Sequence, residues 1–285
     1  MKPLLAHIYE PHRINWMQHI WLQPKLNGVR ALSQGGHFQS RDELPWNGML
    51  EHLSKWMRDM FPRQWVLDGE LYVHGWPLQR INQAVAINAM VRGANKDTPL
   101  VEYHIFDRVS YQQNFESRFF DALLQYRGLL ARNMPIKFVE TTQCKTPDSV
   151  DNFYALQVQR GYEGIMYRLG NCPYTYPKQP GGSGRRKFLS DKNNRVWHML
   201  KRKSWQDAEF TCIRVDEGIG KRLEKAGALV CATPEGKEFG VGSGLTDAEA
   251  EHYLENPPIG HKIKVKFLCY TSDGIPFNPT VEAVL

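Results

Sequence analysis

The stretch Lys25-Leu26-Asn27-Gly28-Val29-Arg30 is the most informative part of this sequence. It places a lysine directly after Pro24 and before a glycine turn, and an arginine in the strand that follows. By itself the pattern says little, since lysines beside turns are common on protein surfaces. Its meaning depends on four further segments that follow in order, namely Asp68-Gly69-Glu70, Phe106-Asp107, Glu163-Gly164-Ile165-Met166 and Leu200-Lys201-Arg202-Lys203.

The surrounding chain of 285 residues has the composition of a globular protein with a surplus of positive charge. Hydrophobic residues make up 42% and charged residues 23%, and 36 Lys and Arg against 30 Asp and Glu give a net charge of +6. Such a surplus suits a polyanionic partner such as nucleic acid, although many basic proteins bind none. The length predicts one or two domains.

Several classes of protein are excluded by the sequence. No run approaches the ~18 consecutive apolar residues that a membrane helix needs, so no membrane partner is expected. The first residues do not form a secretory signal. The five cysteines show neither zinc nor disulfide spacing, and the ten histidines form no common metal-binding motif. We therefore expect a reducing, cytoplasmic location, or the host cytoplasm for a phage-encoded protein.

Strand-like and helical runs are mixed over the first two thirds of the chain. Residues 29–33 and 37–41, joined by Gly35-Gly36, predict a hairpin. A second strand pair is expected over residues 65–73 with its turn at Asp68-Gly69-Glu70, and further strands at 102–106 and 164–168. Helices are expected at residues 49–60, 79–90, 115–132 and 149–159. The mixture predicts an α+β fold with antiparallel sheets.

The character of the sequence changes towards its C-terminus. Pro, Gly, Ser and basic residues crowd residues 176–187, which predicts a mobile loop. After Lys203 the pattern is one of short strands, at residues 209–215, 228–232, 238–241 and 262–270, as is typical of a small β-barrel. We place a domain boundary near Lys203-Ser204, which gives domains of residues 1–203 and 204–285.

Taken together, the five segments resemble the active-site motifs of the covalent nucleotidyltransferases, which comprise ATP-dependent DNA ligases, RNA ligases and mRNA capping enzymes. Residues 25–30 resemble the K-x-D-G-x-R signature of that family, and the other four segments resemble its remaining motifs in order. Residues 240–246 and 260–265 resemble the oligonucleotide-binding (OB) barrel of small DNA ligases. The resemblance covers nearly the whole chain. It implies a minimal, two-domain ATP-dependent DNA ligase, with a nucleotidyltransferase (adenylation) domain followed by an OB-fold barrel.

The resemblance also implies a substrate and a set of site residues. The protein would seal nicks in double-stranded DNA as a monomer, using ATP as AMP donor and Mg²⁺ (or Mn²⁺) as metal ion. The implied catalytic residues are Lys25, Lys201 and Lys203, with Lys25 carrying the AMP. The implied nucleotide contacts are Gln23, Arg30, Glu70 (to the ribose), Phe106 (stacked on adenine), Lys201 and Lys203. Glu163 and Asp68 would hold the metal ion, since Mg²⁺ prefers oxygen ligands.

The chemistry expected of Lys25 requires a neutral amine. The ordinary pKa of lysine is about 10.4, and neighbouring cations and metal ions lower such a pKa and activate the amine. If residues 197–203 form a strand, Lys201 and Lys203 share one face, because side chains alternate with period two. We expect both to meet the triphosphate and to lower the pKa of Lys25.

Basic residues in three places are candidate DNA contacts. Over residues 262–267 lysines alternate with apolar residues, so one face carries three ammonium groups that could follow a phosphate backbone. A solubilising edge strand explains that pattern nearly as well. By resemblance, Arg41 reaches the 5′-phosphate at the nick, and a basic cluster lies on the glycine-rich loop. The candidates are Arg41, Arg185, Arg186, Lys187, Lys262, Lys264 and Lys266.

Two departures from the family pattern keep alternatives open. Asn27 stands where an aspartate is usual, which weakens a metal or ion-pair role there. Residues 273–285 lack the final arginine-and-acid motif of larger ligases, so either Lys262, Lys264 or another basic group replaces it, or enzyme adenylylation is slow. No DNA-binding domain is expected in the 24 residues before Lys25. The alternatives are an RNA ligase acting on RNA or RNA–DNA hybrids, a capping guanylyltransferase, and a non-catalytic nucleic-acid-binding protein on a ligase scaffold.

Overall fold

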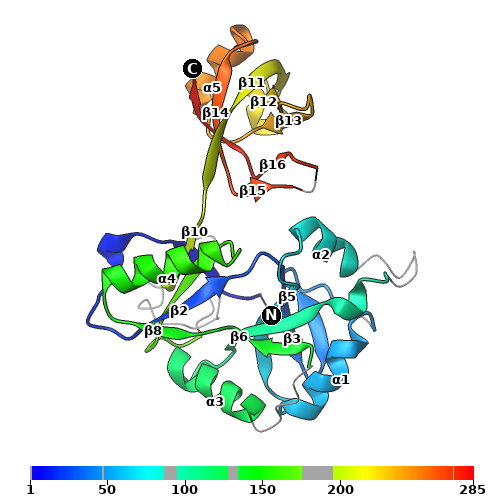
Figure 1. The fold of residues 1–285 in the computed structure, drawn as a ribbon, viewed down its shortest axis with the longest axis vertical. Coiled ribbons are helices and arrows are strands. Elements are labelled where there is room, and N and C mark those ends of the chain that lie inside the picture. Colours follow the sequence, from blue (N-terminus) through cyan, green and yellow to red (C-terminus); the bar gives the residue numbers. More distant parts are fainter. Residues whose placement is uncertain (1, 47, 87–94, 128–133, 175–194, 272) are drawn as a thin grey trace. The chain divides into compact units, whose positions relative to one another are not determined.

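The computed structural model of this protein describes residues 2–46, 48–86, 95–127, 134–174, 195–271 and 273–285. The chain divides into two compact units, Met1–Lys203 and Ser204–Leu285. The division falls at Lys203–Ser204, where the sequence analysis places the domain boundary. Figure 1 shows the strands and helices of each unit.

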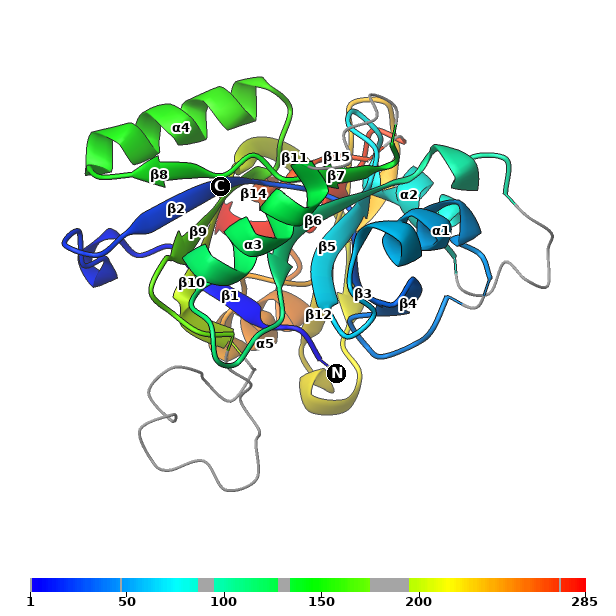
Figure 2. The same ribbon diagram turned by 90° about the horizontal axis from the view of Figure 1, so that it is seen from below.

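The first unit is built on two five-stranded sheets, which contain strands from widely separated parts of the chain (Figure 2). The first sheet has the order β1-β10-β9-β2-β8, with β1 at Leu5–Ile8, β2 at Ile20–Lys25, β8 at Thr142–Cys144, β9 at Gly164–Leu169 and β10 at Arg195–Lys203. The second has the order β4-β3-β5-β6-β7, with β3 at Val29–Gln34, β4 at His37–Ser40, β5 at Val66–Tyr72, β6 at Glu102–Arg108 and β7 at Ile136–Phe138.

The α+β class is confirmed, but the pairing is not purely antiparallel. Strands β1 and β10 run parallel, as do β6 and β7, whereas the other strand pairs of the described residues are antiparallel. The predicted hairpin is present as β3 and β4, closed by Gly35 and Gly36 at φ values of 54° and 80°. Positive φ angles at both positions match the turns that close two-residue hairpins.

The turn predicted at Asp68-Gly69-Glu70 is wrong, because these residues lie inside the continuous strand β5. Gly69 serves close packing instead of chain reversal. A Cβ atom there would lie 2.6 Å from the carbonyl oxygen of His104 and 2.7 Å from the ring of Tyr103. An Asp-Gly pair can thus form a turn or allow close packing inside a strand, and only the neighbouring strand shows which of the two applies.

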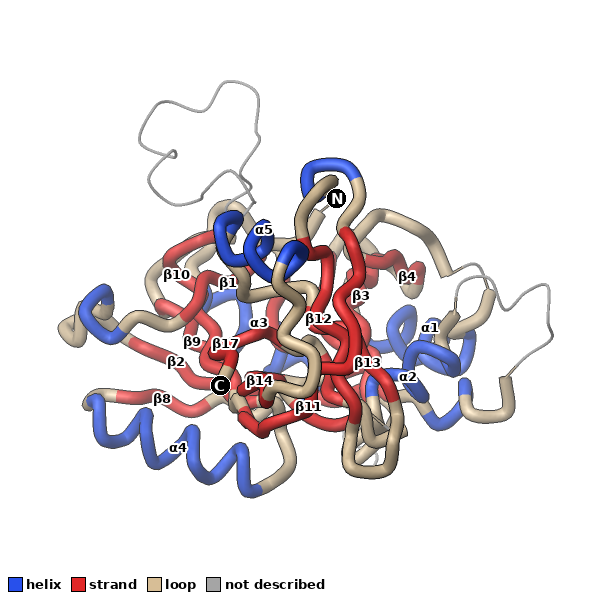
Figure 3. The backbone as a smooth tube through the Cα atoms, turned by 90° about the horizontal axis from the view of Figure 1, so that it is seen from above, coloured by secondary structure: helices blue, strands red, loops and turns tan. Residues whose placement is uncertain are grey.

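In the described part of this unit, four α-helices pack against the sheets. They are α1 at Glu51–Met60, α2 at Leu78–Ala84, α3 at Phe115–Arg127 and α4 at Pro147–Gln159, and short 3₁₀ turns occur at Pro11–Arg13 and Thr98–Leu100. Helix α1 buries Leu53, Met57 and Met60 on one stripe against the second sheet. Helix α4 lies beside β2 and β8 in both Figure 2 and Figure 3. Helix α2 is shorter than predicted and ends at Ala84.

The second unit is a small β structure. Its sheet has the order β13-β12-β11-β14-β17, and β15 and β16 pair separately. The strands are β11 at Gln206–Glu217, β12 at Ala226–Ala232, β13 at Glu238–Val241, β14 at Lys262–Phe267, β15 at Cys269–Tyr270, β16 at Pro276–Phe277 and β17 at Thr280–Val284. A 3₁₀ turn occupies Gly220–Arg222, and helix α5, Asp247–Glu255, begins at a capping box of Thr246 and Glu249 that the sequence analysis missed.

All five cysteines lie in the described residues, and none of them forms a disulfide bond there. No helix among the described residues has the length and apolar character needed to cross a membrane.

Candidate functional site

A cavity of about 470 Å³ in the first unit is lined by both of its sheets, and we call it the inter-sheet pocket. Strands β2, β9 and β10 contribute from one sheet, and β3, β5 and β6 from the other. Its volume lies within the roughly 300–1,000 Å³ usual for small-molecule sites. The structure brings seven of the sequence-predicted residues to this pocket, namely Gln23, Lys25, Arg30, Arg41, Glu70, Phe106 and Lys201.

The segment Leu26-Asn27-Gly28 carries the chain from one sheet to the other. Strand β2 ends at Lys25 in the first sheet, and β3 begins at Val29 in the second. A glycine is required at this crossing, because a Cβ atom at position 28 would lie only 2.4 Å from the carbonyl oxygen of Leu71 and would clash with it. Lys25 and Arg30 therefore line one pocket from two different sheets.

Glu163 joins the two lysines that flank it. Its Oε2 lies 2.5 Å from Nζ of Lys25, and its Oε1 lies 2.6 Å from Nζ of Lys203. Burial favours a higher pKa for Glu163, but the two ammonium groups outweigh burial and the pKa is lowered. Lys203 is thus held by this carboxylate and does not itself line the inter-sheet pocket.

Lys201 is the second lysine that lines the pocket. It lies two residues before Lys203 on β10, as expected from the sequence. Burial, followed by the positive charges of Arg195, Lys203 and Lys25, lowers the pKa of Lys201 to about 8. An amine in this position is charged below that pH and neutral above it.

Asp68 was predicted to hold a metal ion, and the structure places it elsewhere. Its side chain is fully buried, and its carboxylate accepts hydrogen bonds from Nε (2.9 Å) and Nη2 (2.6 Å) of Arg30 and from the hydroxyl of Tyr174 (2.8 Å). Both oxygens are therefore engaged by protein donors, and Asp68 does not line the pocket. This bidentate pair fixes the orientation of Arg30 instead.

The ring of Phe106 has guanidinium groups from both sheets beside it. The Cζ atom of Arg30 lies 5.3 Å from the ring centroid, and that of Arg168 lies 5.2 Å from it. The side chain of Gln23 completes this wall, because its Nε2 donates to the carbonyl of Phe106 (3.0 Å) and its Oε1 accepts from Nε of Arg168 (3.1 Å). The amide of Gln23 is thus used to hold the wall together.

Glu70 on β5 lies opposite Arg30 on β3 in the strand register, and both residues line the pocket. Burial raises the pKa of Glu70 to about 7; Lys25 and Arg30 oppose this rise, and Asp68 and Glu163 add to it. The carboxyl group therefore changes its charge near neutral pH.

The predicted DNA contacts have different surroundings. The side chain of Arg41 lines the pocket and is 60% exposed, with Asp42 at 3.9 Å. In the second unit β14 alternates as predicted, with its apolar residues buried and its lysines facing outward. Acidic neighbours accompany this row, however, because Lys264 lies 2.9 Å from Glu282 and 3.8 Å from Asp207. The cluster Arg185, Arg186 and Lys187 lies outside the described residues.

Several polar residues that line the pocket were not predicted from the sequence, among them Asp42, Asn82, Arg168 and Arg195. For Arg168 a signal existed, because an arginine stands at the end of an otherwise apolar strand. No cluster of three or more His, Cys, Asp or Glu side chains suited to a metal ion occurs among the described residues. The carboxylate of Glu163 contacts Lys25 directly, and that of Glu70 interacts with Lys25 electrostatically.

Fold and site together define a nucleotidyltransferase domain followed by an OB-like domain, with a lysine and several cations around one pocket. Comparison with known families agrees. The ATP dependent DNA ligase domain matches residues 3–183, and the DNA ligase OB-like domain matches residues 217–284. The chain belongs to the family of ATP-dependent DNA ligases.

Relatives and solved structures are similar to this chain to different extents. DNA ligase of African swine fever virus (isolate Warthog/Namibia/Wart80/1980) is 31% identical over 234 residues, which are 77% of this chain and 50% of the viral protein. The chain thus spans about half the length of the curated relatives it matches. A structure from a study of Lig E DNA ligases has a TM-score of 0.77 at 22% identity, covering 100% of this chain and 99% of the other. Chlorella virus DNA ligase-adenylate has a TM-score of 0.53 at 20% identity, covering 100% and 98%.

Proposed function

We propose that this protein is an enzyme that seals nicks in duplex DNA at the expense of ATP. The observation that carries the proposal is the placement of Lys25 at a pocket that both sheets line with cations. Arg30, Lys201 and Arg168 surround a space large enough for a nucleotide, and Phe106 offers an aromatic ring for a base. Arginine and lysine are the side chains that suit phosphate groups.

Three displacements at phosphorus account for the reaction. The neutral amine of Lys25 attacks the α-phosphate of ATP, so that a P–N bond forms, pyrophosphate leaves and the amine loses a proton. An oxygen of the 5′-phosphate at the nick then attacks the lysine-bound AMP, which breaks the P–N bond and returns the lysine. Finally the 3′-hydroxyl attacks the activated 5′-phosphate, loses its proton and displaces AMP. Pocket cations offset the phosphate charge in each step.

Mg²⁺ usually takes one or two carboxylates together with substrate phosphates, and Glu163, which contacts the pocket-lining Lys25, offers such a carboxylate. Glu163 would hold the ion, with the remaining ligands supplied by phosphate and water. Bound there, the ion would neutralise phosphate charge and orient the reacting oxygens. In the structure Glu163 binds two lysines, so an ion would compete with the ammonium groups of Lys25 and Lys203 for its oxygens.

Incubation with Mg²⁺ and α-labelled ATP or GTP tests the proposal directly. We expect label from ATP to remain on the protein in a denaturing gel, and a nicked duplex to become sealed. Absence of covalent label with either nucleotide would contradict the enzyme. Label without sealing of nicked DNA, combined with sealing of nicked RNA, would replace DNA ligase by RNA ligase.

The Michaelis constant for ATP in lysine adenylylation should be lowest between about pH 7 and pH 8. Glu70, with a pKa of about 7, must be ionised to accept hydrogen bonds from both ribose hydroxyls, so ATP and a proton compete and the Michaelis constant rises below pH 7. Lys201, with a pKa of about 8, loses its charge and its attraction for phosphate above pH 8. Initial rates from pH 6 to 9 measure both limbs. Glu70→Gln should flatten the acidic limb alone, and an unchanged acidic limb would exclude Glu70 as its cause.

Lysines on β14 should differ in their importance for DNA binding. Lys262 donates to the hydroxyl of Thr211 at 3.1 Å, whereas Lys264 has the carboxylates of Glu282 and Asp207 beside it. Lys262→Ala should therefore weaken binding of nicked DNA and reduce the salt dependence by about one phosphate contact, and Lys264→Ala should change little. Titrations at several salt concentrations compare the two matched variants. Equal losses of DNA affinity in the two variants would show that the acidic neighbours of Lys264 do not prevent it from contacting DNA.

A further inference from the structure

Strand β6 carries Phe106 and Asp107 at an irregularity in its pairing with β5. Asp68 pairs with Asp107 and Gly69 pairs with Ile105, which leaves Phe106 as the extra residue between them. A bulge of this kind turns side chains away from their regular directions, and bulges are common beside active sites. Phe106 lines the pocket, while the side chain of Asp107 is fully buried. The position of the Phe106 ring therefore depends on whatever holds the bulge.

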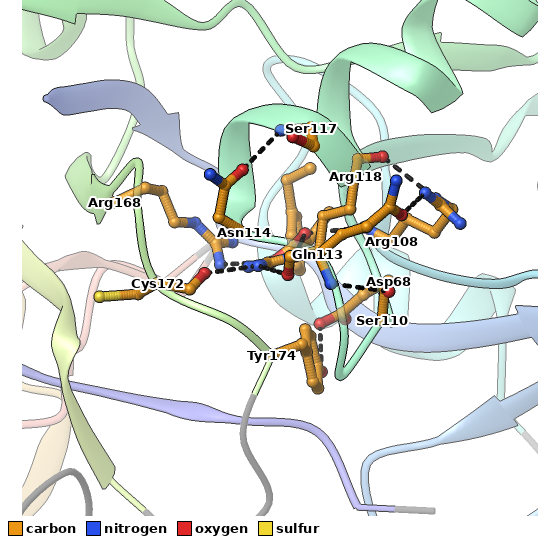
Figure 4. A network of polar contacts seen from close by, with 12 residues as sticks. Asp68, Arg108, Ser110, Gln113, Asn114, Ser117, Arg118, Arg168, Cys172 and Tyr174 are labelled. Carbon is orange, nitrogen blue, oxygen red and sulfur yellow. Dashed lines mark hydrogen bonds and ion pairs between the residues drawn. The ribbon is translucent and has the colours of Figure 1, made fainter.

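Asp107 is held by four donors, which occupy both of its carboxylate oxygens. Oδ1 accepts from the backbone N–H of Arg108 (2.8 Å) and from Nε of Arg118 (2.7 Å). Oδ2 accepts from Nη2 of Arg118 (2.9 Å) and from Nη1 of Arg168 (3.0 Å). Figure 4 shows the guanidinium groups of Arg118, from α3, and Arg168, from β9, converging within this network. The contacts join α3, the bulge of the second sheet and a pocket-lining strand of the first.

Arg118 is itself fixed on all sides. Its side chain is 2% exposed, and its Nη1 donates to the carbonyl of Cys172 at 2.7 Å. Its guanidinium carbon lies 5.3 Å from the ring centroid of Phe115 and 5.6 Å from that of Tyr174. A buried bidentate arginine–carboxylate pair gives a defined geometry, and a lysine cannot reproduce its planar fork. Arg118 does not line the inter-sheet pocket.

We propose that Arg118 is a positioning residue for nucleotide binding, acting through Asp107 on the Phe106 bulge and on Arg168. This inference rests on the proposed function. Through Asp107, Arg118 fixes the position of the Phe106 ring. Through the shared carboxylate it also orients Arg168, whose Nε holds the amide of Gln23. Arg118 lies on α3 and does not line the pocket, but through these contacts it positions the Phe106 ring and the Arg168 guanidinium, which do line it.

The variant Arg118→Lys tests the proposal because it keeps the charge but loses the two-pronged hydrogen bonding. We expect its Michaelis constant for ATP in lysine adenylylation to rise about tenfold, while kcat changes less than about threefold. Sealing by enzyme that already carries AMP should proceed at the wild-type rate, since ATP binding is then complete. Arg160→Lys is the matched control, because Arg160 forms an exposed pair with Glu140 at 3.2 Å. It should behave as wild type.

A double-mutant cycle separates positioning from general stability. In a Phe106→Leu background, Arg118→Lys should raise the Michaelis constant by clearly less than tenfold, because the ring that it positions is gone and only its effect through Arg168 remains. Full additivity, or a Michaelis constant within about twofold of wild type in folded Arg118→Lys, would overturn the proposal. If Arg118→Lys melts below the assay temperature, Asp107→Asn, which keeps the size of the side chain, takes its place in the same cycle.

Failure of the proposed function gives a different result. If the wild-type protein takes no label from ATP, the ligase proposal fails, and this inference fails with it. If the wild type is labelled and Arg118→Lys has an unchanged Michaelis constant for ATP, only the role of Arg118 is contradicted.

Discussion

Lys25→Arg is expected to abolish covalent labelling by α-labelled ATP, with a loss of at least about a thousandfold, because a permanently protonated guanidinium has no nucleophilic lone pair. The variant keeps the positive charge opposite Glu163 and so preserves the ion pair seen at 2.5 Å. A melting temperature close to that of wild type would therefore accompany the loss. Denaturing gels measure the label, and thermal unfolding measures the fold.

Two comparisons make the Lys25 result specific. Lys145→Arg, at an exposed position outside the pocket, should label as wild type does. Lys25→Arg should still join a nick whose 5′-phosphate already carries AMP, since that last step needs no lysine nucleophile. Persistent label on Lys25→Arg would place the nucleophile at another residue and remove the basis of the proposed chemistry.

Gly164→Ala is expected to cause the second large effect, a loss of about 3 kcal/mol or more in the free energy of unfolding. Gly164 has φ = 144°, which side chains rarely adopt, and a Cβ atom there would lie 2.1 Å from the carbonyl oxygen of Arg202. The residue lies between Lys25 on β2 and Lys203 on β10 in the sheet register. Any shift that relieves the clash would therefore separate Glu163 from one of its lysines, and labelling should fall together with stability.

Chemical denaturation measures this loss, and Gly240→Ala provides the control. A Cβ atom at Gly240 would lie 3.5 Å from Cβ of Ala228, which is an ordinary contact. We expect that variant to unfold close to wild type. Similar stabilities of the two alanine variants would mean that β9 and β10 separate at little cost, contrary to the packing described above.

Local patterns in the sequence were sufficient for much of the fold. The hairpin at β3 and β4 follows from a Gly-Gly pair between two strand-like runs, and β14 follows from the alternation of lysines with apolar residues. Alternation failed at residues 65–73, where a glycine needed for close packing against Tyr103 had the appearance of a turn. The resemblance of the five segments to the motifs of the covalent nucleotidyltransferases also implied several of the residues that line the pocket.

Partners across sheets could not be predicted in the same way. Asp68 is the clearest case, because an acidic residue in a motif suits a metal ion equally well as an arginine until the third dimension brings Arg30 and Tyr174 to it. For Lys264, the carboxylate of Glu282 comes from the neighbouring strand β17. Long-range ion pairs depend on strand order, which short-range patterns do not encode.

The sequence, through the stretch from Lys25 to Arg30 and the four motifs that follow it, therefore indicated the residue proposed as nucleophile and the arginine that follows it into the next strand. Only the tertiary structure decided that β2 and β3 belong to different sheets, so that Lys25 and Arg30 line one pocket from two sides. The same holds for the ion pairs of Glu163 and for the tie between Arg118 and Asp107. The physical reason is that the type of each residue is written in the sequence at its own position. A cavity and the charges around it, in contrast, form only when strands and helices from distant parts of the chain pack together.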